Sequence, residues 1–271
     1  MAHSIETALP AREGLQARDN RRASRAELLG TLADALTADS FTLYYQPIID
    51  LRGGGVAHYE ALLRIPAAGG ALRTPGRYLQ AAEESGLIVA VDRAVIARAI
   101  RVLAYDPRFF GAALAVNISG LSATDESLPD EIERLLEEHG VEPARLTLEV
   151  TETAAIRDMA GARAVCRRVR ALGCEIAIDD FGAGFGSFQY LKHLPFDYLK
   201  IDGEFIRALP NSRTDQLVVS ALAGIVAGLG RLTIAEFVGD ERTLELLREY
   251  GVDMAQGHAV GRPAAEPLLI S

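Results

Sequence analysis

The sequence predicts an α/β fold, a (β/α)8 TIM-like barrel whose first strand is antiparallel to its neighbour. Three observations carry this prediction. Short apolar runs of strand length alternate with longer segments in which apolar residues recur every three or four positions, as they do in helices. Eight such runs occur within 271 residues, which favours a closed barrel over an open sheet. Only seven residues, 49–55, separate the first two runs.

The eight predicted strands lie between residues 41 and 256, and the last of them has the weakest pattern. They are FTLYYQPI (41–48), VAHYEALLRI (56–65), AALAVN (112–117), RLTLEV (145–150), CEIAID (174–179), FDYLKI (196–201), LTIAE (232–236) and DMAQ (253–256). Alternation of strand and helix favours a mainly parallel sheet with helices outside it. The first connection, IDLRGGG, is too short for a parallel crossover, which needs about a dozen residues, and its glycines suit a tight turn. We therefore predict that the first strand is antiparallel to the second.

The helical segments between the strands have ordinary lengths. The segment at residues 74–86 is expected to begin at Thr74 as the cap, with Pro75 in the first turn, where a missing N–H costs nothing. The other helices are expected within residues 92–104, 126–140, 158–173, 214–230 and 241–251, and several of these end in glycine. Residues 1–40 form a leader or linker with one amphipathic helix, and residues 41–271 form one barrel domain.

Composition excludes several classes of protein. The net charge is −9, from 28 Lys+Arg against 37 Asp+Glu, which argues against binding of long nucleic acid. The longest nearly apolar stretch, residues 217–229, is too short for a membrane span, which needs about 20 residues. The first ten residues lack a secretory signal, and two isolated cysteines, Cys166 and Cys174, are typical of a reducing compartment. We therefore expect a cytoplasmic protein with no membrane span.

Polar residues occur repeatedly where the apolar strands end. They are Glu60, Asn117, Glu149, Asp179, Asp180, Lys200, Glu236 and Gln256. In a barrel the carboxyl ends of parallel strands meet at one mouth, where such folds carry their catalytic groups. Each residue alone has an ordinary explanation as a helix cap, a turn residue or a solvated loop residue. The set as a whole is harder to explain in that way.

Five carboxylates at one mouth would repel one another strongly unless cations were bound. Oxygen ligands suit hard divalent ions such as Mg²⁺ or Mn²⁺, and the lack of a Cys or paired-His cluster argues against zinc. The adjacent Asp179 and Asp180 could serve a two-metal site, in which metals about 3.5 to 4 Å apart activate water and stabilise a phosphoryl displacement. Lys200 would add a cation near the developing charge.

Eight motifs in order resemble one known family. They are YYQPI (44–48), YEALLR (59–64), VNIS (116–119), LEVTE (148–152), DDFGAGFGSF (179–188), DYLKID (197–202), AEFV (235–238) and QGHAVGRP (256–263). From Phe41 to Pro263 the chain resembles the EAL-domain phosphodiesterases, which hydrolyse one phosphodiester bond of the bacterial second messenger cyclic di-GMP to give linear pGpG. The family fold is the barrel with an antiparallel first strand.

The resemblance implies a role for each matching residue. Glu60, Asn117, Glu149 and Asp179 would bind one metal, and Asp180 and Glu236 would serve a second, with Asp179 shared. The catalytic group would comprise Lys200, Glu236 and Glu60; the substrate would be held by Gln46, Leu63, Arg64, Asp202 and Gln256; and Glu152 would stabilise the glycine-containing loop. Cyclic di-GMP would be the small-molecule partner. The resemblance also implies a homodimer, and residues 1–40 could link to an upstream sensory or cyclase domain.

The chain departs from the family pattern at four positions. Gly239 stands where a second Glu is frequent, Phe237 where Gly is common, His258 where Tyr is common and Gly186 where Ser is usual. None of these removes a metal ligand. Three hypotheses stay open: an active cyclic di-GMP phosphodiesterase, a catalytically degenerate receptor and dimerising signalling module for the same nucleotide, and another metal-dependent phosphoesterase on the same fold.

Overall fold

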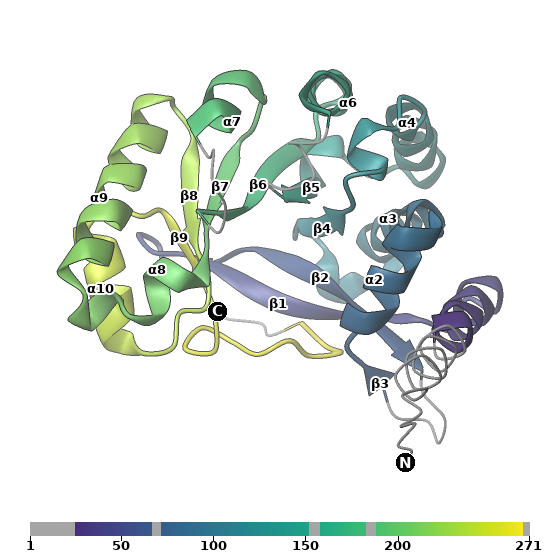
Figure 1. Cartoon of the computed structure of the whole chain (residues 1–271), viewed down its shortest axis with the longest axis horizontal. Helices are drawn as coiled ribbons and strands as arrows, with labels where there is room; N and C mark the ends of the chain where they lie inside the picture. The colour runs from purple at the N-terminus through teal and green to yellow at the C-terminus, as the bar shows by residue number, and fades with distance from the viewer. Residues whose placement is uncertain (1–24, 67–71, 152–157, 183–187, 268–271) are drawn as a thin grey trace, which may run out of the picture.

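The computed structural model describes residues 25–66, 72–151, 158–182 and 188–267. Within them, eight strands close into a barrel with helices around the outside (Figure 1). The barrel strands are β1 (Thr42–Asp50), β2 (Val56–Pro66), β4 (Leu114–Ile118), β5 (Leu146–Thr151), β6 (Glu175–Phe181), β7 (Tyr198–Ile201), β8 (Leu232–Ala235) and β9 (Met254–Gln256). All eight predicted strands are therefore confirmed, with shifts of one or two residues at most of their ends.

Strand β1 is antiparallel to both of its neighbours, β2 and β9, whereas the neighbours from β2 through β4 to β9 pair in parallel. The prediction from the short first connection is confirmed. A two-residue strand, β3 (Leu72–Arg73), adds to the end of β2 in the antiparallel sense. It was not predicted, because two exposed residues carry no alternating pattern.

The six helices predicted between the strands are confirmed, and among the described residues two short helices, Phe188–His193 and Gly203–Arg207, occur that were not predicted. The helices between the strands are α2 (Gly76–Ser85), α3 (Ile88–Tyr105), α4 (Leu128–His139), α6 (Met159–Leu172), α7 (Phe188–His193), α8 (Gly203–Arg207), α9 (Arg213–Gly228) and α10 (Glu241–Glu249), with 3-10 turns at Pro107–Phe109, Ser122–Thr124, Pro143–Arg145 and Leu209–Asn211. The predicted cap at Thr74 is wrong: α2 starts one residue later, Pro75 occupies the cap position and no side chain accepts a hydrogen bond there. The glycines that follow α2, α4 and α6 adopt left-handed backbone, as their positions predicted.

The hydrophobic core has two parts. A large shell lies between the strands and the surrounding helices and includes Leu148, Ile178 and Leu199. A small cluster fills the barrel interior. The helical residues 25–37 join the outer shell through Leu32 and Ala35, both almost fully buried. Within the described ranges, no helix is both long and apolar enough to cross a bilayer.

Candidate active site

Lys200 lies at the centre of the barrel mouth, and its side chain is only 1% exposed. Its Nζ atom is 2.8 Å from Glu149 Oε2, 3.0 Å from Asp179 Oδ1, 3.0 Å from Glu236 Oε1 and 3.6 Å from Glu60 Oε2. These groups come from β2, β5, β6 and β7 and from the residue that follows β8. Convergence of strand ends thus brings together residues up to 176 positions apart, from Glu60 to Glu236.

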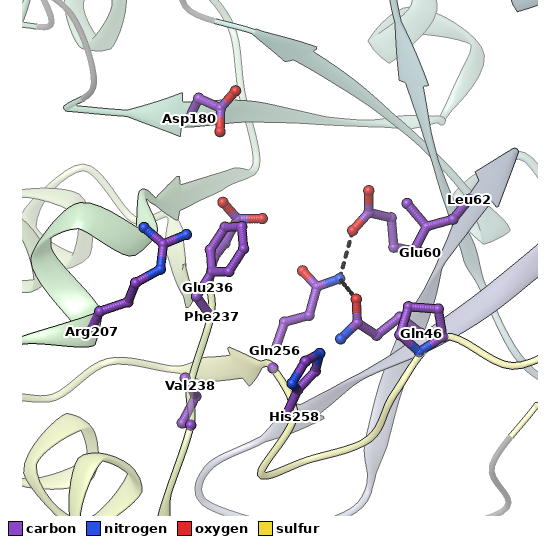
Figure 2. A pocket seen from close by; sticks show the side chains of 13 residues that line it. Gln46, Glu60, Leu62, Asp180, Arg207, Glu236, Phe237, Val238, Gln256 and His258 are labelled. Carbon is purple, nitrogen blue, oxygen red and sulfur yellow. Dashed lines mark hydrogen bonds between the residues drawn. The ribbon is translucent and has the colours of Figure 1, made fainter. Parts of the chain in front are cut away.

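Amide side chains hold the Glu60 carboxylate from two sides. Asn117 Nδ2 donates to Oε1 at 2.6 Å, and Gln256 Nε2 donates to Oε2 at 2.5 Å. Gln256 Nε2 also lies 3.2 Å from Gln46 Oε1 (Figure 2). Gln46 Nε2 in turn donates to the Gly261 carbonyl at 3.0 Å. Burial raises the pKa of Glu60, but the Lys200 charge and these donors outweigh burial and lower it. Glu60 is therefore held as an anion.

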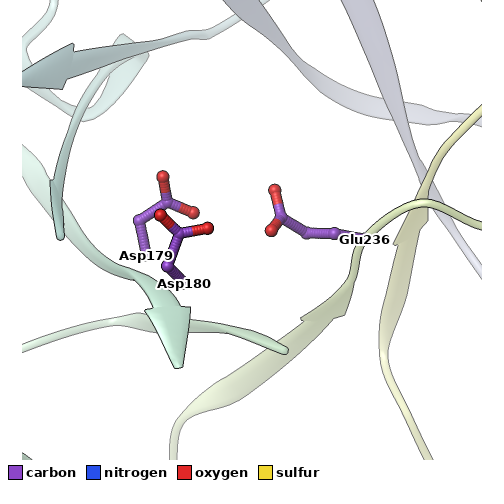
Figure 3. Close-up of side chains that lie close together, drawn as sticks. All are labelled: Asp179, Asp180 and Glu236. Atoms are coloured by element: carbon purple, nitrogen blue, oxygen red, sulfur yellow. The ribbon is translucent and has the colours of Figure 1, made fainter. Parts of the chain in front are cut away.

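The adjacent Asp179 and Asp180 reach the same space. Neighbouring residues in a regular strand point to opposite faces, but β6 is irregular between Ile178 and Phe181, where its register with β7 shifts. Asp180 has left-handed backbone, with φ of 55°. The irregularity allows both carboxylates to face Glu236, and each of the three offers an oxygen within 4.8 Å of the others (Figure 3).

The carboxylates at the mouth are short of positive charge. Burial, followed by the charges of neighbouring acids, raises the pKa of Asp180 to about 6. Burial also raises the pKa of Glu236 to about 8 and that of Glu149 well above its usual range, although Lys200 opposes both shifts. For Lys200 itself, burial lowers the pKa, and the surrounding acids more than reverse this. One lysine cannot neutralise five carboxylates.

This donor set fits divalent cations. Every ligand atom in the cluster of Asp179, Asp180 and Glu236 is an oxygen, as hard ions such as Mg²⁺ and Mn²⁺ prefer. Glu149 Oε1 is buried and has no hydrogen-bond partner within the part of the chain that the structure describes. An acceptor left unpaired at that depth is costly, and a bound cation would satisfy it.

A cavity of about 510 Å³ opens beside these carboxylates (Figure 2). The predicted residues that line it are Gln46, Glu60, Asp180, Glu236 and Gln256. The three departures from the family pattern that the structure describes, at positions 237, 239 and 258, also line it. Arg207, Val238 and Pro263 are lining residues that the sequence analysis missed. No strand-end or spacing pattern marks them.

Leu63, a predicted substrate contact, does not line this cavity. It is 8% exposed and packs in the outer hydrophobic shell, whereas Leu62 lines the cavity. Side chains alternate along β2, so residue 62 shares the face of Glu60 and residue 63 does not. That alternation could have identified Leu62 from the sequence.

The remaining predicted residues fall into two groups. Arg64 donates to the Leu63 carbonyl at 2.9 Å and lies over the Tyr44 ring, and Asp202 caps α8 by accepting from the Glu204 N–H at 2.6 Å. Among the described residues, neither is part of the cavity lining. Glu152 and Gly186 lie outside the described residues.

Comparisons with known proteins agree with this geometry. The family model described as the EAL domain matches residues 30–263. The chain is 38% identical over 248 residues to the bifunctional diguanylate cyclase/cyclic di-GMP phosphodiesterase MucR of Pseudomonas aeruginosa, a match that covers 90% of this chain and 36% of that protein. It is 33% identical to the cyclic di-GMP phosphodiesterase PdeF of Escherichia coli, covering 90% of this chain and 32% of the relative. The chain thus spans about a third of the length of these relatives.

Solved structures show the same fold. The MucR phosphodiesterase in its cyclic di-GMP complex superposes with a TM-score of 0.80 at 36% identity, covering 88% of this chain and 97% of that one. The Xanthomonas citri FimX EAL domain in complex with cyclic di-GMP gives a TM-score of 0.83 at 31% identity, covering 94% and 98%. The family match over most of the chain, together with the barrel and its acidic mouth, establishes that this protein belongs to the EAL domain family.

Proposed function

We propose that this barrel is a metal-dependent phosphodiesterase that hydrolyses cyclic di-GMP to linear pGpG. The observation that carries the proposal is the group of four carboxylates that contact the buried Lys200, with the Asp180 carboxylate beside them, at the edge of the 510 Å³ cavity. The named activity of the relatives and the cyclic di-GMP in two similar structures support this substrate.

Two cations would be held by two sets of residues that share Asp179. Glu60, Asn117, Glu149 and Asp179 would hold one, and Asp180 and Glu236 would hold the other together with Asp179. When bound, Mg²⁺ or Mn²⁺ would lower the pKa of a water molecule and stabilise charge on the phosphoryl oxygens.

The chain's own groups then position and balance that chemistry. Lys200 Nζ supplies a fixed positive charge within 3.0 Å of three carboxylates and would face the attacking water and one phosphate oxygen. Asn117 and Gln256 fix the orientation of Glu60 through its two oxygens. Glu236 lines the cavity with Oε1 3.0 Å from Lys200 Nζ, and as a metal ligand it would be held deprotonated.

Further substrate contacts are proposed on the same basis. Gln46 and Gln256 line the cavity and would hydrogen-bond the nucleotide. Arg64 would bind a phosphate oxygen pair, for which a guanidinium is better shaped than an ammonium. Asp202 would complete the guanine or phosphate surround. A homodimer and a linked sensory or cyclase domain are further proposals. Analytical ultracentrifugation would test the first, and the sequence of the full gene would test the second.

The decisive experiment is a turnover assay with separated products. Purified protein incubated with cyclic di-GMP and Mg²⁺ or Mn²⁺ should yield pGpG, which chromatography and mass spectrometry would identify. Glu60→Ala should abolish hydrolysis, whereas Glu133→Ala, an exposed helix substitution of the same type, should not. No product with either metal would reject the proposal.

Gly239 favours a second candidate, a catalytically degenerate receptor for cyclic di-GMP. Gly239 lines the cavity, and a Cβ there would meet nothing within 4 Å. The space that the second Glu side chain of the family would fill is therefore open in this chain. Calorimetry that shows binding, combined with no product, would favour the receptor. Competition by other phosphodiesters would separate both candidates from a phosphoesterase with a different substrate.

A further inference from the structure

Phe237 is a large aromatic residue exposed inside a polar cavity. Its side chain is 53% exposed, it directly follows Glu236, and it lines the same 510 Å³ space (Figure 2). Its backbone has φ of 53°, in the left-handed region that a bulky residue rarely adopts. Such strain costs about 1–3 kcal/mol and concentrates at functional sites, where the surrounding structure holds it.

Helix α8 supports the ring from one side. The Arg207 guanidinium carbon lies over the Phe237 ring, 4.0 Å from its centroid. A Cβ at Gly203 would come within 2.3 Å of Phe237 Cδ2, so only a glycine leaves room for the ring in this position. Gly203 and Arg207 are four residues apart and therefore share one face of α8. The ring is backed by this face, and its exposed surface belongs to the cavity.

A flat, apolar, exposed surface between polar groups matches a nucleobase. Stacking of a base on an aromatic side chain is worth about 1–3 kcal/mol and needs no particular hydrogen bond. The Arg207 guanidinium lies against one face of this ring and leaves the other face for a base. We propose that Phe237, held in place by Arg207 and Gly203, forms a stacking platform that binds one guanine of the substrate. This inference rests on the proposed substrate, cyclic di-GMP, and adds an aromatic contact for one of its bases.

The first test replaces the ring. Phe237→Gly keeps the left-handed backbone without strain, so the variant is expected to fold. The Kd for cyclic di-GMP measured by calorimetry should rise by roughly 5- to 150-fold, the equivalent of 1–3 kcal/mol. In turnover, KM should rise far more than kcat falls, because the ring would contact the base of the substrate and not the reacting phosphate.

A fluorescent probe reports stacking independently of turnover. In a cyclic dinucleotide with 2-aminopurine in place of one guanine, stacking should quench the fluorescence on binding to the wild-type chain, and Phe237→Gly should reduce that quenching. Gly203→Ala should have the same effect by displacing the ring, whereas Gly224→Ala, where a Cβ meets nothing within 4 Å, should not. Failure to form pGpG would reject the proposed hydrolysis without altering this readout.

Substitution of Arg207 tests the support of the ring. Arg207→Ala should reduce the quenching of the 2-aminopurine probe, because the ring loses the group that packs against its other face. Arg207→Lys should recover only part of the quenching, because an ammonium lacks the flat face of a guanidinium. The proposed stacking would be wrong if the probe fluorescence were quenched equally by Phe237→Gly and by the wild type. It would also be wrong if the wild type bound the probe without quenching it.

Discussion

Two walls of the same site are built on opposite principles. The amide-braced wall consists of Gln46, Glu60, Asn117 and Gln256, and its carboxylate accepts hydrogen bonds from two amides. The strained wall consists of Asp179, Asp180, Glu236 and Phe237, and two of these residues have left-handed backbone. On the first wall the pKa of Glu60 is lowered, whereas on the second the pKa of Asp180 is raised to about 6 and that of Glu236 to about 8.

The difference indicates a division of labour between the walls. The braced wall presents a carboxylate whose charge and orientation are already fixed by protein groups. The strained wall brings acids together without donors to balance them, so its anionic state depends on cations or protons. Lys200 joins the walls, because it contacts Glu60 on one side and Asp179 and Glu236 on the other.

Removal of that link should have the largest effect. Lys200→Met keeps a long side chain but leaves the buried Glu149 without its partner. We expect kcat to fall by roughly 10²- to 10³-fold, as when a preorganised electrostatic group is lost. Metal-free protein should also lose about 3–5 kcal/mol of unfolding free energy, which urea titration in EDTA would measure. Lys192→Met, an exposed lysine in α7, is the matched control and should leave both quantities near the wild-type values. Equal loss in both variants would contradict a special role for Lys200.

Metal removal should separate the two walls by their pH dependence. Because the folded pKa values of Asp180 and Glu236 are raised, their contribution to stability is complete below the unfolded pKa values and is lost as the pH rises through about 6 and 8. EDTA-treated protein should therefore lose stability as the pH rises from about 4 to about 8, the range between the unfolded and folded pKa values. Cations bind the deprotonated acids, so Mn²⁺ should raise Tm more at pH 8.5 than at pH 6. At a hundredfold excess over Kd the gain would be about 2.7 kcal/mol. A metal-induced shift in Tm that is larger at pH 6 would contradict this account.

Asp180→Asn removes one of the three carboxylate charges of the strained wall. The backbone should keep its conformation, because Asn tolerates left-handed φ. Loss of a residue that only supports a metal ligand lowers metal affinity by roughly 10- to 100-fold. Because Asp180 is proposed as a ligand itself, the metal affinity measured by calorimetry should fall by at least that much. The metal-free variant should be more stable at pH 8.5 than the wild type, since one repelling charge is gone. Asp130→Asn, on the exposed face of α4, controls for the change of residue type. Unchanged metal affinity in Asp180→Asn would remove this residue from the metal site.

The two walls also differ in what could be predicted from sequence. Glu60 and Lys200 could be predicted to lie together because both lie in predicted strands, close to where the apolar pattern ends. A barrel topology then suffices to bring those strand ends to one mouth. The shared orientation of Asp179 and Asp180 depends on an irregularity in β6, and the stacking of Phe237 on Arg207 depends on a left-handed non-glycine residue. Local patterns do not encode either feature. The role predicted for Leu63 in substrate binding stays a prediction, and the alternation along β2 places Leu62 in the cavity lining.

Gly239→Glu should change kcat less than the preceding substitutions. It tests whether the strained wall lacks a carboxylate where it faces the cavity. A Cβ at position 239 meets nothing within 4 Å, so the side chain can be added with little change in unfolding free energy. By resemblance, the added carboxylate would accept a hydrogen bond near Lys200 and support the proton transfer. We expect kcat to rise by only a few-fold, because a complete general acid or base contributes about 10²- to 10⁴-fold. Gly239→Gln, of equal size but without charge, is the control. A rise in kcat for Gly239→Glu but not for Gly239→Gln would mean that the strained wall lacks a proton acceptor and not merely a side chain of that size. A fall in kcat for both variants would show that the substrate needs the space at Gly239.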